Sequence, residues 1–173
     1  MIKYQRVNSE ALFQRDVLIV APWLIGKYLV RKFDDGRIIR LKITETEAYN
    51  GVEDLACHAS KGKTIRNQIM FEQGCFVYMY LIYGMYWMLN IVTGEEHSPQ
   101  AVLIRGVEGF DGPGKLTRQL QLDKSFYGEN ICFSERLWIE DDNLIYPYKT
   151  SARIGIDYAN EPWKSIEWRF ILI

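Results

Sequence analysis

Two short segments hold residue types that could together break the bond between a nucleic-acid base and its sugar. Residues 45–49 read Glu-Thr-Glu-Ala-Tyr and carry two carboxylates two positions apart. Residues 78–86 read Tyr-Met-Tyr-Leu-Ile-Tyr-Gly-Met-Tyr, which places four tyrosines around a glycine. Aromatic side chains stack on bases, and a carboxylate can activate water for attack on a sugar carbon. The combination suits an enzyme that extrudes a base and removes it.

The two carboxylates acquire a function only if they face a pocket. In a strand, alternation puts Glu45, Glu47 and Tyr49 on one face. If that face is solvent, the pair has no chemical meaning. If it lines an aromatic pocket, desolvation raises the pKa of a carboxylate toward the range of a general base. The residue pattern alone leaves both readings open.

The tyrosine segment raises the same question. Tyr78 and Tyr80 would share a strand face, and a tyrosine stripe is typical of a core as well as of a binding wall. Tyr83 falls at a turn, where Gly, Asn, Asp and Pro are the usual residues. A large aromatic at an exposed tip fits a wedge that fills the gap left by an extruded nucleotide.

The order and wording of these segments resemble the alkyladenine (3-methyladenine) DNA glycosylase family, with gaps, from about residue 16 to residue 170. Further matching segments are His-Ala-Ser-Lys-Gly-Lys-Thr-Ile-Arg-Asn at 58–67, Val-Leu-Ile-Arg at 102–105, Gly-Pro-Gly-Lys-Leu at 112–116 and Ala-Arg-Ile-Gly-Ile at 152–156. The resemblance implies a monofunctional glycosylase that excises damaged purines of the 3-methyladenine, hypoxanthine and ethenoadenine class. It implies no metal and no organic cofactor.

The resemblance also assigns roles to single residues. Glu47 would be the general base, while Arg105 and the backbone carbonyl of Ile154 would help to hold the attacking water. Glu45 would be structural, paired with a basic residue. The walls of the base pocket would be Tyr49, His58 and Tyr80. Asn90 would lie on the floor and crowd the exocyclic amine of normal guanine, and Tyr83, with Met85 beside it, would enter the minor groove.

Charge gives weaker guidance about the partner. The net charge is −1, whereas a DNA-binding domain is usually basic. Local patches can still contact phosphates, and the expected DNA contacts are Lys63, Arg66 and Lys115. The chain departs from the family pattern at Ile65, where proline is common, and in the short segment between Arg105 and Gly112. We expect double-stranded DNA with a damaged purine as the partner.

The elements that must position these residues predict an α+β fold. We expect one domain spanning residues 1–173, with a curved antiparallel sheet, hairpins and a few flanking helices. The expected helices cover 16–26 and 115–122, the first weakened by Pro22. An Asp-Gly turn at 34–36 joins two strands. The expected strands are 27–33, 37–49, 76–82, 86–93, 101–108, 130–139, 151–156 and 168–173.

Cysteine usage favours a reduced, intracellular (cytoplasmic) protein. The resemblance implies that it is DNA-associated, and nothing in the sequence demands more than a monomer. The three cysteines form no CxxC pair, so neither a disulfide framework nor a zinc site is expected. The most apolar stretch, residues 17–30, is shorter than the ~20 residues of a membrane helix. Two rival functions stay open: a non-catalytic nucleic-acid-binding module with an aromatic stacking surface, and a hydrolase of small glycosides using Glu45 and Glu47.

Overall fold

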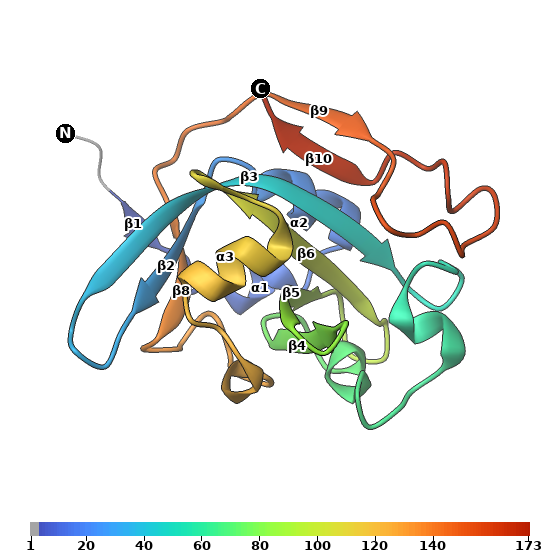
Figure 1. The fold of residues 1–173 in the computed structure, drawn as a ribbon, viewed down its shortest axis with the longest axis horizontal. Coiled ribbons are helices and arrows are strands. Elements are labelled where there is room, and N and C mark those ends of the chain that lie inside the picture. Colours follow the sequence, from blue (N-terminus) through green and yellow to red (C-terminus); the bar gives the residue numbers. More distant parts are fainter. Residues whose placement is uncertain (1–3) are drawn as a thin grey trace.

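The computed structural model describes residues 4–173, and within them ten strands form one antiparallel sheet that does not close (Figure 1). The spatial order is β1-β8-β2-β3-β6-β5-β4, while β7, β9 and β10 pair at its sides. The strands are β1 (Gln5–Arg6), β2 (Tyr28–Lys32), β3 (Ile38–Asn50), β4 (Val77–Ile82), β5 (Tyr86–Thr93), β6 (Gln100–Val107), β7 (Phe110–Asp111), β8 (Leu137–Asp141), β9 (Tyr148–Ser151) and β10 (Arg169–Leu172).

Three short α-helices pack on this sheet within the described residues, and the predicted α+β class is confirmed. They are α1 (Glu10–Phe13), α2 (Val17–Trp23) and α3 (Pro113–Gln119). Short 3₁₀ turns cover His58–Lys61, Gln68–Phe71 and Lys124–Phe126. Helix α2 contacts β3 and β6, and α3 contacts β5 and β6 (Figure 1). The fold is therefore built mainly from the sheet, and the helices cover parts of its surface.

Helix α2 forms as its sequence indicates. The Asp16 side chain accepts a hydrogen bond from the Leu18 N–H at 2.8 Å, which caps the first turn. Val17, Val20 and Ala21 are buried against the sheet. Pro22 lies in the last turn, so the helix ends at Trp23, earlier than the predicted residue 26.

A β-bulge in β3 decides which residues face the site. Before it, Ile43 packs in the main core, and after it the core residues are Thr46 and Ala48. The register against β6 shifts between Ile43 and Glu45 and again before Thr46. A bulge inserts one residue and exchanges the faces of the strand that follows. Consequently Glu45 and Glu47 turn away from the core, although simple alternation from Ile43 would point them into it.

Two predicted strands are wrong in part. Of residues 130–139, only the end belongs to a strand, because β8 begins at Leu137. The Asn130 side chain accepts a hydrogen bond from the Cys132 N–H and so stabilises a turn instead. Of residues 151–156, only Ser151 is in a strand, at the end of β9. Both segments contain apolar and β-branched residues, which are typical of strands, but their backbone forms turns instead.

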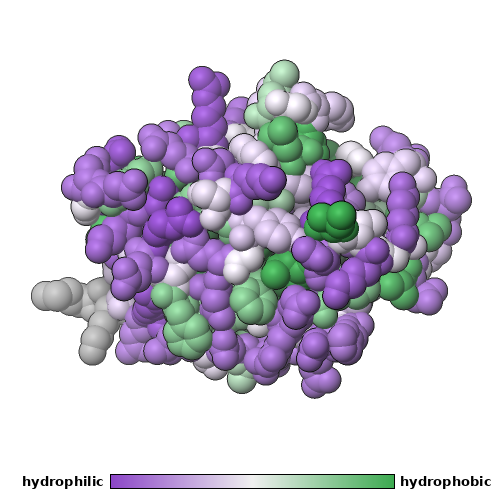
Figure 2. All heavy atoms as spheres, turned by 90° about the horizontal axis from the view of Figure 1, so that it is seen from below, coloured by the Kyte–Doolittle hydropathy of each residue, from purple (hydrophilic) through white to green (hydrophobic). Residues whose placement is uncertain are grey.

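The described residues include no helix with the length and hydropathy needed to cross a membrane. On the face shown in Figure 2, hydrophilic residues predominate and apolar residues occur in small, separate areas.

Candidate active site

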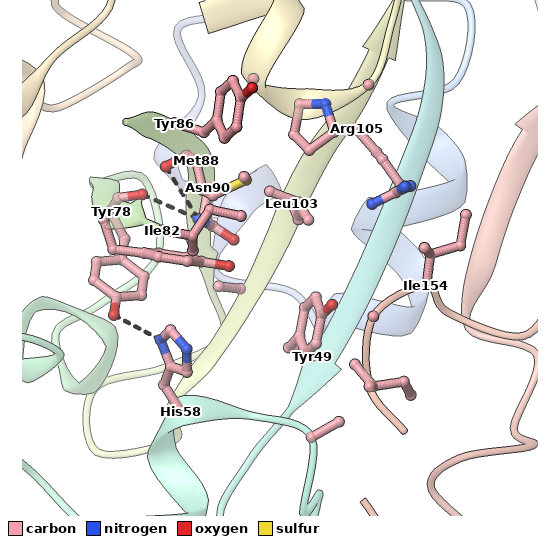
Figure 3. Close-up of a pocket in the computed structure, with 18 of the residues that line it drawn as sticks. Tyr49, His58, Tyr78, Ile82, Tyr86, Met88, Asn90, Leu103, Arg105 and Ile154 are labelled. Atoms are coloured by element: carbon pink, nitrogen blue, oxygen red, sulfur yellow. Dashed lines mark hydrogen bonds between the residues drawn. The ribbon is translucent and has the colours of Figure 1, made fainter. Parts of the chain in front are cut away.

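A pocket of about 580 Å³ lies over one face of four adjacent strands. The strands stand in the order β3-β6-β5-β4. Alternate residues of β4, β5 and β6 line the pocket, and β3 contributes Tyr49 (Figure 3). The opposite face packs in the main core. The residues of these four strands that line the pocket are Tyr49, Tyr78, Tyr80, Ile82, Tyr86, Met88, Asn90, Ala101, Leu103 and Arg105.

Strand register brings distant segments of the chain together at this pocket. Leu103 of β6 lies opposite Glu47 of β3 on one side and opposite Asn90 of β5 on the other. Tyr80 of β4 lies opposite Met88 of β5. The carboxylate segment and the tyrosine segment, separate in sequence, therefore share one surface through β6 and β5.

Glu47 is completely buried and held by donors on both carboxylate oxygens. The Tyr49 hydroxyl donates to Oε2 at 2.7 Å, and the Ile154 N–H donates to Oε1 at 2.8 Å. Arg105 Nε lies 3.6 Å from Oε1. Burial raises the pKa of Glu47 above its ordinary value, although Arg105, the Ile154 N–H and the Tyr49 hydroxyl each act to lower it. Each oxygen keeps a second lone pair with which a water could bond.

Glu45 is engaged in ion pairs, as predicted. Its Oε1 lies 3.0 Å from Arg105 Nε and 2.9 Å from Arg169 Nε. Arg169 reaches this position because β10 pairs with β3 directly opposite Glu47. Glu45 thus shares Arg105 with Glu47, which leaves the buried carboxylate with only part of that positive charge.

His58 and the tyrosines of β4 form an aromatic wall. The rings of His58 and Tyr80 lie 4.6 Å apart, and those of Tyr78 and Tyr80 lie 5.4 Å apart. His58 Nδ1 bonds the Tyr78 hydroxyl at 2.8 Å (Figure 3). Burial, together with the positive charges of Arg66 and Lys61, lowers the pKa of His58 to about 4. The imidazole is therefore neutral at physiological pH and adds no positive charge to the wall.

Asn90 is anchored to the main chain on the pocket floor. Its Nδ2 donates to the carbonyl oxygens of Tyr78 and Met88, at 3.2 and 3.4 Å. Figure 3 shows both bonds on the nitrogen, with the amide oxygen directed away from them. Because both N–H groups bond to backbone oxygens, the Asn90 side chain is held in a fixed position.

The turn between β4 and β5 presents Tyr83 to solvent. Tyr83 is 86% exposed. It has a φ of 51° and Gly84 has a φ of 66°, while the Met85 N–H donates to the Ile82 oxygen at 3.1 Å. Two consecutive positive φ values are typical of a tight hairpin turn, and a tyrosine there is strained. Such strain at an exposed tip motivates a functional interpretation.

The predicted DNA-contacting cations lie around this pocket with different partners. Lys115 lines the pocket. The Arg66 guanidinium lies 5.2 Å from the centre of the Tyr80 ring and donates to the Leu81 oxygen, so it also supports the β4–β5 hairpin. Lys63 Nζ lies 3.8 Å from a carboxylate oxygen of Glu72, with both side chains about half exposed.

Among the described residues, no group of three or more His, Cys, Asp or Glu side chains could hold a metal ion. The three cysteines are buried free thiols.

Comparison with known proteins identifies the family. The model of the methylpurine-DNA glycosylase family matches residues 11–111 and 109–173. The chain belongs to this family. A protein of Methanocella arvoryzae is 42% identical over 88% of each chain. One of Psychrobacter cryohalolentis is 41% identical over 93% of this chain and 91% of its own. One of Desulfitobacterium hafniense is 39% identical over 97% and 95%. All three carry the name "Putative 3-methyladenine DNA glycosylase".

Membership makes the chain a DNA glycosylase, an N-glycosyl hydrolase. Of the residues predicted for its site, Tyr49, His58, Tyr80, Tyr83, Asn90, Arg105, Lys115 and Ile154 line the pocket. Glu47 lies behind three of them and contacts Tyr49, Arg105 and Ile154. Met85 is exposed beside Tyr83 at the turn. The roles of these residues stay predictions.

Sequence reasoning missed several residues of the pocket and its support. Tyr86, Met88, Leu103 and Tyr158 line the pocket. Tyr86 and Met88 alternate with Asn90 along β5 and could have been found by extending that pattern backwards from Asn90. Arg153, directly before Ile154, is buried behind the pocket together with Asp54. It stands inside the quoted 152–156 motif, but its partner is 99 residues away and no sequence spacing indicates the pair.

Proposed function

We propose that this DNA glycosylase extrudes an alkylated or deaminated purine from duplex DNA and cleaves its N-glycosidic bond with water activated by Glu47. The observation that carries the proposal is one buried carboxylate, with a raised pKa and three surrounding donors, beside an aromatic pocket. A pocket of about 580 Å³ is large enough for a purine base. Glu47 is the one acidic side chain in contact with Tyr49, Arg105 and Ile154 together, among the residues described.

In the proposed reaction the base stacks between Tyr49, His58 and Tyr80. The bond between C1′ and the base nitrogen breaks, and its electron pair leaves with the base. Water attacks C1′ and gives its proton to Glu47, with Arg105 and the Ile154 carbonyl as further partners of that water. The products are the free base and an abasic site in an uncut strand.

The aromatic walls of the pocket support the proposed substrate class. Alkylation of a purine ring nitrogen makes the base cationic, and a cation between aromatic faces gains about 0.5–2 kcal/mol. A neutral His58 avoids repelling that cation. The positive charge also makes the base a better leaving group. Neutral lesions such as hypoxanthine and ethenoadenine would depend more on hydrogen bonds, and the Asn90 amide would crowd the exocyclic amine of guanine and so exclude it.

Extrusion of the base would rely on Tyr83. An exposed aromatic at the hairpin tip can fill the space of the departed nucleotide and offset an unstacking cost of a few kcal/mol. Met85 beside it would add apolar contact, and Lys63, Arg66 and Lys115 would contact phosphates. We propose that the partner is double-stranded DNA, bound by a monomeric single domain inside the cell.

The small-glycoside alternative loses support at Glu45. That reaction needs a second carboxylic acid to protonate the leaving group. The Glu45 carboxylate is instead engaged by Arg105 and Arg169 in two ion pairs, so it is held away from a leaving group.

The test is base release from labelled duplexes that each carry one lesion: 3-methyladenine, hypoxanthine or ethenoadenine. Alkali then converts abasic sites to strand breaks. We expect release by the wild type, strand cleavage only after alkali, and no release by Glu47→Gln. The matched control is Glu108→Gln, which changes an exposed carboxylate directly after β6 and should retain activity. Binding of duplex by the wild type without release of any lesion would favour the non-catalytic binding module.

A further inference from the structure

The two hydrogen-bond donors on Glu47 depend on the same buried guanidinium. Arg153 directly precedes Ile154, whose N–H donates to Glu47. The Arg153 guanidinium also lies 4.8 Å from the centre of the Tyr49 ring, whose hydroxyl donates to the other oxygen. One side chain therefore supports both donors, although it makes no contact with the carboxylate among the described interactions.

Arg153 is held by hydrogen bonds on both terminal nitrogens of its guanidinium. Its Nη1 and Nη2 bond Asp54 Oδ2 and Oδ1 at 2.6 and 2.9 Å, and neither side chain is exposed. Nη1 also donates to the Ala48 oxygen at 2.9 Å, which ties it to β3 between Glu47 and Tyr49. On the far side, the guanidinium lies 5.2 Å from the centre of the Trp168 ring. A planar guanidinium with two parallel bonds holds position and orientation together.

Asp54 extends this support to the end of β3. Its Oδ2 accepts from the Asn50 N–H and its Oδ1 from the Ala56 N–H, both at 3.0 Å. Asn50 follows Tyr49 directly. The Asp54 carboxylate thus fixes the backbone on one side of Tyr49, while Arg153 holds the backbone before it and the ring itself.

We propose that Arg153 and Asp54 are positioning residues for the general base, because their ion pair holds the Tyr49 hydroxyl and the Ile154 amide against Glu47. The inference rests on the proposed role of Glu47. Its alternative is that the pair only joins the C-terminal loop to β3. A buried ion pair is weak evidence for stability. Arg153 Nε is buried with no hydrogen-bond partner among residues 4–173, which is a cost to the fold.

The pH dependence of the reaction separates these two roles. The groups that face Glu47 are Glu45 and Tyr49 on β3, Arg105 on β6, Arg169 on β10, Tyr80 on β4 and Tyr158 in the C-terminal loop. Tyr49 and Ile154 stabilise the ionised carboxylate, so loosening them raises the pKa of Glu47 further. Since the base must be ionised, the acid limb of the rate profile then moves to higher pH.

The experiment measures single-turnover base release against pH for the wild type, Arg153→Lys, Tyr49→Phe and the double variant. Arg153→Lys keeps the charge but loses the planar fork. For Arg153→Lys we expect the rate of base release to fall roughly tenfold at the pH optimum. The acid limb of its pH profile should move up by roughly half a pH unit. Affinity for a duplex with an abasic site should stay within about twofold of wild type. The double variant should lose clearly less than the product of the two single losses, because the residues act through one another.

A matched control is Arg40→Lys. It weakens another bidentate ion pair, the one between Arg40 and Glu140 near the other end of β3. It should leave the acid limb in place. An unmoved acid limb in Arg153→Lys, or multiplicative losses in the double variant, would overturn the proposal. If Arg153→Lys does not fold, the same measurements are made on Asp54→Asn. If neither variant folds, the ion pair serves the fold, and the proposal is overturned. Wild type that releases no base contradicts the proposed function itself.

Discussion

At the scale of the residue, Glu47 combines full burial with incomplete charge compensation. Three donors approach it, yet burial prevails and its pKa is raised. Glu45 takes part of the positive charge of Arg105. A carboxylate poised in this way accepts a proton more readily than an exposed one. The same arrangement should weaken the fold, because the ionised form is buried at neutral pH.

Glu47→Gln should therefore stabilise the protein while abolishing catalysis. A carboxyl whose pKa is raised on folding stabilises the native state only when protonated, so this contribution is lost as pH rises through the folded-state pKa. Glutamine stays neutral, and its advantage should grow as pH rises above about 4.5, the ordinary pKa. We expect a gain of about 1 kcal/mol at pH 8.

Urea unfolding at pH 5 and pH 8 measures this difference. Glu108→Gln, in which an exposed carboxylate is neutralised, should show little change at either pH. A Glu47→Gln variant that is less stable than wild type at pH 8, or whose gain is the same at both pH values, would contradict the interpretation.

The site residues were predictable from sequence to different degrees. Strand alternation places Glu45, Glu47 and Tyr49 on one face, and the resemblance to the family selects Glu47 among them. The same alternation could not choose between core and pocket, because the bulge before Thr46 exchanges the faces. Arg169 and Arg153 reach the site through pairings with distant segments, and no local pattern indicates either contact.

At the scale of the element, the β4–β5 hairpin has a strained turn that exposes an aromatic side chain, and this strain lowers the stability of the hairpin. Its turn has positive φ values at Tyr83 and Gly84, for which Asn-Gly is the favoured sequence. A tyrosine in the first of these positions costs free energy and contributes no burial, since it is 86% exposed. The hairpin was predicted correctly from its two apolar runs, but its strained backbone was not, because Tyr83 is an unusual residue for that turn.

Tyr83→Asn should raise stability and lower activity on duplex DNA. Asparagine tolerates the left-handed region, so we expect a gain of roughly 1 kcal/mol in the free energy of unfolding. Without an aromatic wedge, base release from a duplex should fall at least tenfold. Thermal unfolding and single-turnover release measure the two effects. A less stable variant would show that the turn is not strained, and undiminished release would remove Tyr83 from base extrusion.

At the scale of the whole molecule, the net charge is −1, although the family acts on DNA, which is a polyanion. Several cations are engaged in ion pairs away from the pocket, among them Lys27 with Asp141 and Arg136 with Glu129. Lys115 at the pocket has no carboxylate within 4.0 Å among residues 4–173. The net charge argued against DNA binding because it counts the ion-paired cations away from the pocket together with a cation such as Lys115 at the pocket.

Lys115→Gln should reduce the salt dependence of duplex binding. Each neutralised phosphate contributes about −0.9 to the slope of log K against log salt, so the slope should become shallower by about 1. The loss of affinity should be similar for damaged and undamaged duplexes. Lys149→Gln, an exposed change on β9, is the control and should leave the slope unchanged. An unaltered slope in Lys115→Gln would place the phosphate contacts elsewhere.

The most direct test of the account compares Glu47→Gln with wild type on one duplex that carries ethenoadenine. Both proteins are assayed for binding of that duplex and for single-turnover release of the base. The account predicts equal binding within about threefold and a loss of release of at least a thousandfold, since the variant keeps the pocket and lacks the base. Release by Glu47→Gln at a rate close to that of wild type would contradict the assignment of Glu47 and, with it, the proposed mechanism.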